Sequence, residues 1–89
     1  MHNTFVKDPE ASLDYSWDWS LWLAAGDSIN TFTLSLDGLT EESSSDAAGV
    51  VTAVLSGGTV GRTHAVKCHI VTTNGLIDER TIFIQIRNR

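Results

Sequence analysis

The stretch LDYSWDW at residues 13–19 alternates large apolar side chains with small polar or acidic ones. Successive side chains of a β-strand point to opposite faces, so this period of two predicts a half-buried strand. Large aromatic side chains dominate the energetics of small cores, and we therefore expect Trp17 and Trp19 to point inward. The third tryptophan, Trp22, falls just beyond the strand and is predicted either to close one end of the core or to contact a partner.

Outward from this stretch, short segments rich in Val, Ile, Thr and aromatic residues recur between turn signals, and no segment has an apolar stripe at helical spacing. The sequence therefore predicts an all-β fold. A chain of 89 residues with about seven short antiparallel strands is typical of a single β-sandwich domain, here spanning residues 1–89. The expected strands lie at residues 3–7, 13–19, 29–36, 39–44, 48–55, 63–72 and 79–87.

Two turn signals and one acidic segment refine this prediction. Asn74-Gly75 predicts a hairpin in which both residues adopt positive φ. Ser56-Gly57-Gly58 is a second, less specific hairpin signal. The segment 40–49 has three acids and no bulky apolar side chains before Val50, and we expect it to be an edge strand or a loop.

The last two predicted strands supply the other half of the core. In 63–72 the alternation places His64, Cys68 and their neighbours of the same parity inward, and His64 is expected to make the corner hydrogen bond that a Tyr often makes in sandwiches. In 79–87 the inward positions are those of Ile82, Ile84 and Ile86. Phe83 then points outward, and an exposed phenylalanine indicates a partner.

The net charge of −5 is unevenly distributed: residues 1–46 hold nine acids against one base, and residues 62–89 hold five bases against two acids. An acidic surface disfavours phosphate backbones, so we expect no nucleic-acid partner. A single cysteine, Cys68, forms no internal disulfide and fits a reducing compartment. The sequence shows no secretory signal and no apolar run long enough to cross a membrane, and we expect neither.

The residues that carry chemistry do not converge in sequence. His64 and Cys68 are four strand positions apart, or about 13 Å between Cα atoms, and His69 points the other way, so no metal site is expected. Asp14 and Asp18 are read as solvated carboxylates rather than as an acid–base pair or cation ligands. We find no nucleophile motif and no phosphate-binding loop, and we predict no enzyme and no cofactor.

Several short motifs occur along the chain in this order: KDP (7–9), LDY (13–15), DWS (18–20), WL (22–23), LSGGT (55–59), VTT (71–73), Gly75 and DERT (78–81). In these motifs and their order the chain resembles the small virion proteins of tailed bacteriophages, of the fibre-tail adaptor or neck type. The resemblance spans nearly the whole chain and departs from the family at His64, where a Tyr is common, and near Cys68, where a more polar residue is common. It implies an immunoglobulin-like sandwich in the phage particle, without catalysis or cofactor.

The resemblance predicts a structural virion protein, assembled in the host cytoplasm, that binds other phage proteins of the capsid, neck, tail or fibre. Trp22, Phe83 and Arg87 are the candidate partner-binding residues. The charge split suggests a homo-oligomer in which the acidic face of one copy meets the basic face of the next. The alternative is a host-surface glycan-binding or adhesion module with an aromatic platform of Trp22 and Tyr15. Residues 1–7 are either a strand of the sandwich or an arm exchanged with a neighbour.

Overall fold

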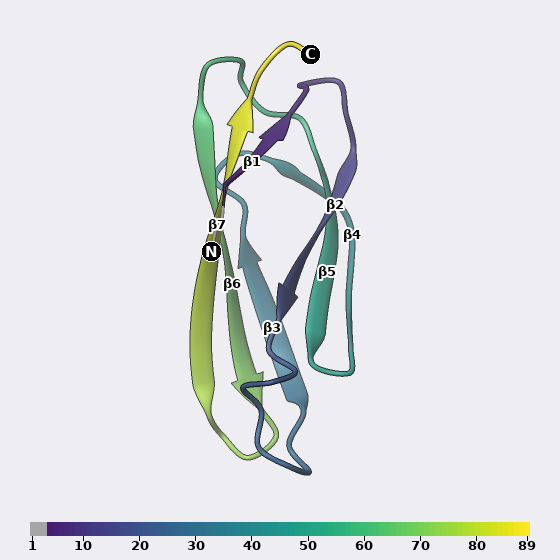
Figure 1. The fold of residues 1–89 in the computed structure, drawn as a ribbon, viewed down its shortest axis with the longest axis vertical. Helices are drawn as coiled ribbons and strands as arrows, with labels where there is room; N and C mark the ends of the chain where they lie inside the picture. Colours follow the sequence, from purple (N-terminus) through teal and green to yellow (C-terminus); the bar gives the residue numbers. More distant parts are fainter. Residues whose placement is uncertain (1–3) are drawn as a thin grey trace.

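A computed structural model describes residues 4–89, which form seven β-strands in two facing sheets (Figure 1). Within these residues there is no helix, and hence no helix able to span a membrane. The all-β prediction is confirmed, and each predicted range overlaps one observed strand. The strands are β1 (Thr4–Lys7), β2 (Leu13–Asp18), β3 (Ile29–Ser35), β4 (Thr40–Ala47), β5 (Val50–Ser56), β6 (Thr63–Thr72) and β7 (Ile77–Ile86).

One sheet has the strand order β1-β7-β6-β3 and the other the order β2-β5-β4. The strands pair antiparallel except β1, which runs parallel to β7. The prediction of seven antiparallel strands is therefore wrong at β1. Pro9 follows β1, and the chain crosses there to the other sheet instead of turning back along its neighbour. The predicted arm of residues 1–7 lies outside the described residues at positions 1–3, whereas residues 4–7 form this strand.

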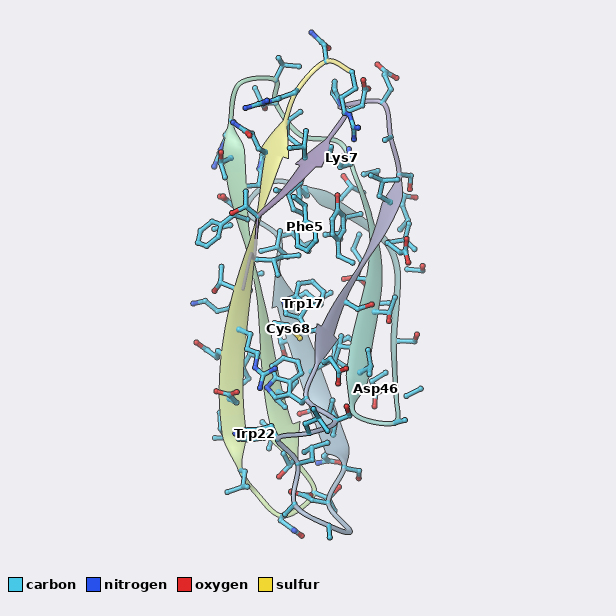
Figure 2. The ribbon with its side chains drawn as sticks, in the orientation of Figure 1. Phe5, Lys7, Trp17, Trp22, Asp46 and Cys68 are labelled. Atoms are coloured by element: carbon cyan, nitrogen blue, oxygen red, sulfur yellow. The ribbon has the colours of Figure 1, made fainter. Side chains whose placement is uncertain are left out.

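The core lies between the two sheets and is built from the predicted alternations. Trp17 of β2 points between the sheets toward the layer that holds Cys68 of β6 (Figure 2). Leu13, at the start of β2, stays half-exposed, so the alternation becomes buried only from Tyr15 onward. The buried apolar residues are Tyr15, Trp17, Trp19, Ile29, Leu39, Val51, Ala53, Leu55, Val66, Cys68, Ile70, Ile82, Ile84 and Ile86.

Trp19 joins the end of β2 to the opposite sheet. Its indole Nε1 donates a hydrogen bond of 2.8 Å to Asp78 Oδ2 on β7. The guanidinium of Arg80 lies 4.9 Å from the centre of the indole ring, a cation–π contact, and donates to the Asp18 carbonyl at 2.6 Å. Arg80 also forms a local ion pair with Asp78 at 3.6 Å. Because Trp19 has no exposed surface, these polar contacts satisfy its one donor inside the fold.

The predicted hairpin at Asn74-Gly75 joins β6 and β7, but its turn type differs from the prediction. Only Gly75 has positive φ, at 87°. Its N–H donates to the Thr72 carbonyl at 3.0 Å, and the Thr72 hydroxyl accepts a bond of 3.0 Å from the Leu76 N–H. This is a type I turn closed by a left-handed glycine. The Thr72 hydroxyl thus accepts a hydrogen bond from a turn amide, a contact that the Asn-Gly signal in the sequence does not predict.

The second hairpin prediction is wrong, because β5 and β6 belong to different sheets and Ser56-Gly57-Gly58 begins a crossover between them. The hairpin that was missed joins β4 to β5 through Ala48 and Gly49, at φ 51° and 84°. Alanine rarely adopts positive φ and gives no turn signal. Of the two alternatives for the acidic segment, an edge strand or a loop, the structure shows the edge strand, because β4 lies at the margin of its sheet.

His64 makes the predicted corner contact at the start of β6. Its ring is buried, with Nδ1 lying 2.7 Å from the Asp37 carbonyl and Nε2 accepting the Thr59 N–H at 3.3 Å. An amide can only donate, so Nε2 is the acceptor and Nδ1 carries the hydrogen. His64 therefore ties the turn after β3 to the loop that precedes β6, which is a structural role.

Candidate interaction surfaces

Trp22 lies in the segment between β2 and β3. The N–H groups of Trp22 and Leu23 both donate to the Trp19 carbonyl, at 2.9 and 3.0 Å, so the chain makes one tight turn directly after the buried Trp19. This turn directs Leu21 fully into solvent and leaves Trp22 41% exposed. Trp22 lies near the lower end of the molecule in Figure 2. It is therefore an accessible aromatic residue, and not part of the core.

The turn between β6 and β7 lies at the same end and is tied to the segment that carries Trp22. Asp27 Oδ1 accepts the N–H groups of Ser28 and Asn74, at 2.9 and 3.1 Å. The N–H of Thr73 donates to the Ser28 carbonyl at 2.9 Å. This end also exposes Leu21, Leu76 and Ile77, which the sequence did not mark as exposed because they lie outside the predicted strands. We call the four exposed residues the end patch: Leu21, Trp22, Leu76 and Ile77.

Phe83 lies on the outer face of the four-stranded sheet. In the register of this sheet it is flanked by Thr4 of β1 and Ala65 of β6, and it is 41% exposed. Val6, two positions along β1, is also partly exposed. Arg87 follows the end of β7 and its N–H donates to the Lys7 carbonyl at 3.0 Å. The predicted exposure of Phe83 is confirmed.

The three predicted partner-binding residues do not form one site. Phe83 lies in the part of β7 that pairs with β1, and Arg87 lies just beyond it, whereas Trp22 belongs to the opposite end. The structure thus separates two exposed apolar surfaces: the end patch, and the face around Phe83. Their roles in binding remain predictions.

The three-stranded sheet is acidic, whereas the strands of the four-stranded sheet are close to neutral, with Lys7, Lys67 and Arg80 against Asp78 and Glu79. The strands β2, β4 and β5 contain five carboxylates and no lysine or arginine. The basic residues of the second half lie on or beside β6 and β7, where Lys67 pairs with Glu79 at 3.8 Å and His69 with Glu79 at 2.8 Å. On the outer face of the three-stranded sheet, Asp14 and Asp18 share a side with half-buried Val50 and Val54.

The candidate catalytic and metal-binding groups do not come together. No group of three His, Cys, Asp or Glu side chains within residues 4–89 lies close enough to hold a metal ion. Burial raises the pKa of the Cys68 thiol to about 12, so the sulfur is a neutral core atom at ordinary pH. Asp18 Oδ1 accepts the Ser20 N–H at 2.8 Å, and the hydrogen bonds from Ser20 hold the pKa of Asp18 low. Asp18 therefore stabilises the turn that precedes Trp22.

The aromatic platform of the glycan-binding alternative is not formed. Tyr15 is only 6% exposed and its ring packs edge-on against Phe5, with ring centres 5.3 Å apart. Trp22 lies on the segment beyond the other end of β2, so the two rings do not make a common surface. The interpretation of Tyr15 and Trp22 as a shared stacking surface is wrong, because Tyr15 belongs to the inward alternation that continues into Trp17.

A buried lysine was missed by the sequence analysis. Lys7 has no exposed surface, and its ammonium donates to the carbonyl groups of Gly57 at 2.7 Å and Asp8 at 2.8 Å. Burial lowers the pKa of Lys7, against the charges of Asp8 and Glu10, which raise it. In the parallel register Lys7 pairs with Ile86, an inward position, and this is why the lysine enters the interior. Lys7 fastens β1 to the crossover loop.

Asp37 gives the fold a dependence on pH. Its carboxylate accepts the Ala65 N–H at 2.9 Å and pairs with Arg62 at 2.8 Å. The Ala65 bond, opposed by burial and assisted by Arg62, holds the pKa of Asp37 below its usual range. A carboxyl with a depressed pKa stabilises the fold above its unfolded-state pKa, and this contribution is lost as the pH falls through the folded-state pKa.

We therefore expect the free energy of unfolding to fall more steeply for the wild-type chain than for Asp37→Asn as the pH is lowered from about 5 to about 2. Urea titrations across this range measure the slope. The control is Asp14→Asn, on the exposed outer face, which should keep the wild-type slope. Equal slopes for wild type and Asp37→Asn would show that the Ala65 and Arg62 contacts contribute nothing in solution.

Comparison with known proteins identifies one family. A protein-family model described as podophage GP4 fiber-tail adaptor protein gp77 matches residues 7–85. This range includes all of β2 to β6 and nearly all of β7. No curated protein matches the chain.

Proposed function

The chain belongs to the family of podophage fiber-tail adaptor proteins, and from this premise we propose that it is a non-catalytic module that joins other proteins of the virion at the tail. The family indicates a structural protein of a phage tail. An adaptor must hold at least two partners at once, so it needs separate contact surfaces on a rigid body.

The separation of the two apolar surfaces is the observation that carries this proposal. The end patch has Trp22 as its aromatic residue, and the face around Phe83 lies toward the opposite end. Exposed aromatic residues are common binding hot spots, because they bury a large area with little loss of side-chain entropy. We assign partner binding to Trp22, Phe83 and Arg87, with Arg87 supplying a charge at the rim of the Phe83 face.

The strand order supports an immunoglobulin-like classification. In immunoglobulin constant domains the second, fifth and fourth strands are consecutive in one sheet, and the third, sixth and seventh form the other. Both orders occur here, as β2-β5-β4 and β7-β6-β3. Only the first strand differs, since β1 lies beside β7 and not beside β2. We propose that the chain is an immunoglobulin-like sandwich with a relocated first strand.

Several copies are proposed to assemble around the tail after synthesis in the host cytoplasm. The outer face of the three-stranded sheet carries Asp14 and Asp18 and is complementary in charge to the Lys67 and Arg87 side of the four-stranded sheet. Contact between two different faces is head-to-tail, and such contacts close into a ring when the rotation allows. Because exposed charges are screened by salt, this association is expected to weaken at high ionic strength.

Quantitative mass spectrometry of purified, DNA-filled particles tests the proposed function. We expect a few copies of this chain for many copies of the major capsid protein. Trp22→Ser and Phe83→Ser should each lower the copy number several-fold, because both remove an exposed aromatic contact while the isolated chain unfolds at an unchanged urea concentration. Leu13→Ser, another half-exposed apolar position, is the matched control and should leave the copy number unchanged.

The outcomes separate the possible places in the particle. A copy number close to that of the capsid protein would indicate shell decoration and contradict a tail adaptor. Absence from particles would overturn the virion role. Normal incorporation of both aromatic variants would show that neither surface binds a partner.

A further inference from the structure

The outer strands of the two sheets are protected unequally against pairing with another chain. Edge strands in natural proteins are commonly blunted by short length, by charge or by proline. β1 has four residues and is followed by Pro9, and both β2 and β4 carry carboxylates. β3 has seven residues, INTFTLS, with neither charge nor proline, and its one irregularity lies at its start, between Ile29 and Thr31. The outer edge of β3 is therefore the least protected of the described strands.

The side of the sandwich along which β3 forms the outer strand is also incompletely covered. β2 lies over β1 and β7, since Phe5 packs on Tyr15 and Trp19 bonds to Asp78. β3 and β4 are thus the outer strands on the other side, and no described strand joins them. Apolar residues on and beside β3 pack against the core but remain partly exposed there. They are Leu23, Phe32, Leu34 and Leu36.

The β4 margin of this side is acidic. Glu41 and Asp46 are in register with Leu55 and Val51, which point into the core, and cross-strand partners share a face. Ser44 donates to Glu41 Oε2 at 2.8 Å, which places these two side chains together on that face. We call the region the open side: an apolar wall of Leu23, Phe32, Leu34 and Leu36, and an acidic wall of Glu41, Ser44 and Asp46.

A surface hollow marks the lower part of the open side. It has a volume of about 370 Å³, and its lining includes Leu23, Ile29 and Asp46. Asp46 lies beside the turn that joins β4 and β5 (Figure 2). The hollow therefore brings a residue of the apolar wall, the start of β3 and a carboxylate of β4 to one place.

We infer that the open side binds an extended basic segment of another virion protein, which adds to β3 as a further strand; this inference rests on the proposed function. Strand addition supplies main-chain hydrogen bonds to the free edge, and alternate side chains of the added strand point inward. Inward lysine or arginine side chains fit both walls, because their aliphatic stems cover the apolar wall while their charged ends reach Glu41 and Asp46.

A second copy of this chain fits the open side less well. Pairing of β3 with β3 across a two-fold axis would bring the acidic walls of both copies toward each other. Like charges at short range repel, and the repulsion would strengthen as the two walls lost solvent in such a contact. The two occupants therefore respond in opposite directions to a change of sign at Asp46.

Amide hydrogen exchange of the chain, free and in intact particles, tests the inference. We expect the β3 amides that point away from β6 to exchange at least about tenfold more slowly in particles, because each gains a hydrogen-bond partner. If the chain is present in particles but its exchange in β3 is unchanged, the inference is overturned and the proposed function stands. Absence of the chain from particles overturns both.

A charge-reversal pair identifies the occupant. Asp46→Lys should lower the copy number in particles several-fold, whereas Glu10→Lys, an equal charge change at an exposed position outside the open side, should leave it unchanged. If exchange in β3 is slower in particles but the copy number of Asp46→Lys is undiminished, the occupant of the open side is not a basic segment. In that case, sedimentation of the free chain in an analytical ultracentrifuge decides the occupant. Tighter self-association of Asp46→Lys than of the wild type would identify a second copy.

Discussion

Replacing Trp19 with alanine is expected to lower the free energy of unfolding by about 3–5 kcal/mol, a large part of the roughly 5–15 kcal/mol typical of a domain. Trp19 is fully buried and is the residue at which β2 meets β7. Its loss leaves a cavity, removes the cation–π contact of Arg80, and leaves Asp78 Oδ2 without its indole donor. Urea unfolding followed by circular dichroism measures the change.

Two further variants keep this prediction testable if Trp19→Ala fails to fold. Trp19→Phe retains a ring but no N–H, so it should lose less stability than the alanine variant. Trp22→Ala removes an indole of equal size from an exposed position and should change stability by under about 0.5 kcal/mol. Equal losses for Trp19→Ala and Trp22→Ala would contradict the placement of the two tryptophans.

Much of the fold could be predicted because the period-two alternation is strong in the central strands. Trp17 and Trp19 in the first half, and the inward isoleucines of β7 in the second, define two apolar faces that must cover each other. The acidic, serine-rich composition of 40–49 indicated an edge strand or a loop, and its first eight residues form the edge strand β4. These signals are local: each can be read within one strand, without knowledge of its neighbours.

The missed features depend on contacts between distant parts of the chain. The parallel pairing of β1 with β7 has no sequence signal, because the two strands are at opposite ends of the chain. Lys7 becomes buried only because that pairing places it opposite Ile86, with the Gly57 carbonyl within reach. The hairpin at Ala48 was missed because alanine at positive φ is unfavourable and survives only where the surrounding strands impose it.

The candidate surfaces follow the same division. Phe83 could be predicted as exposed, because it alternates with buried isoleucines in one strand. The open side could not be predicted, since Phe32 and Leu34 read as ordinary inward residues of β3. Their partial exposure arises from the sheet topology, because β3 and β4 are the outermost strands on the same side and no described strand covers that side. An added strand there would complete a cover that the chain itself does not supply.

Replacing Gly58 with alanine is expected to destabilise the fold by about 2–5 kcal/mol, from two separate causes. Gly58 has φ 107°, where a side chain strains the backbone. A Cβ at this position would also lie 2.6 Å from Ile86 Cγ1 and Cδ1, and 3.2 Å from Leu39 Cδ2. Ile86 is fully buried, so its side chain can move only by displacing neighbours in the close-packed core.

Gly61→Ala separates the two causes, because Gly61 lies in the same crossover loop at φ 87° with no atom within 4 Å of the added Cβ. It should show the backbone strain alone, about 1–2 kcal/mol. The excess loss in Gly58→Ala then measures the contact with Ile86, and equal losses in urea titrations would contradict that contact. Ile86 is opposite Lys7, whose ammonium bonds to the Gly57 carbonyl, so displacement of the loop at Gly58 also loosens β1 and the adjoining Phe83 surface.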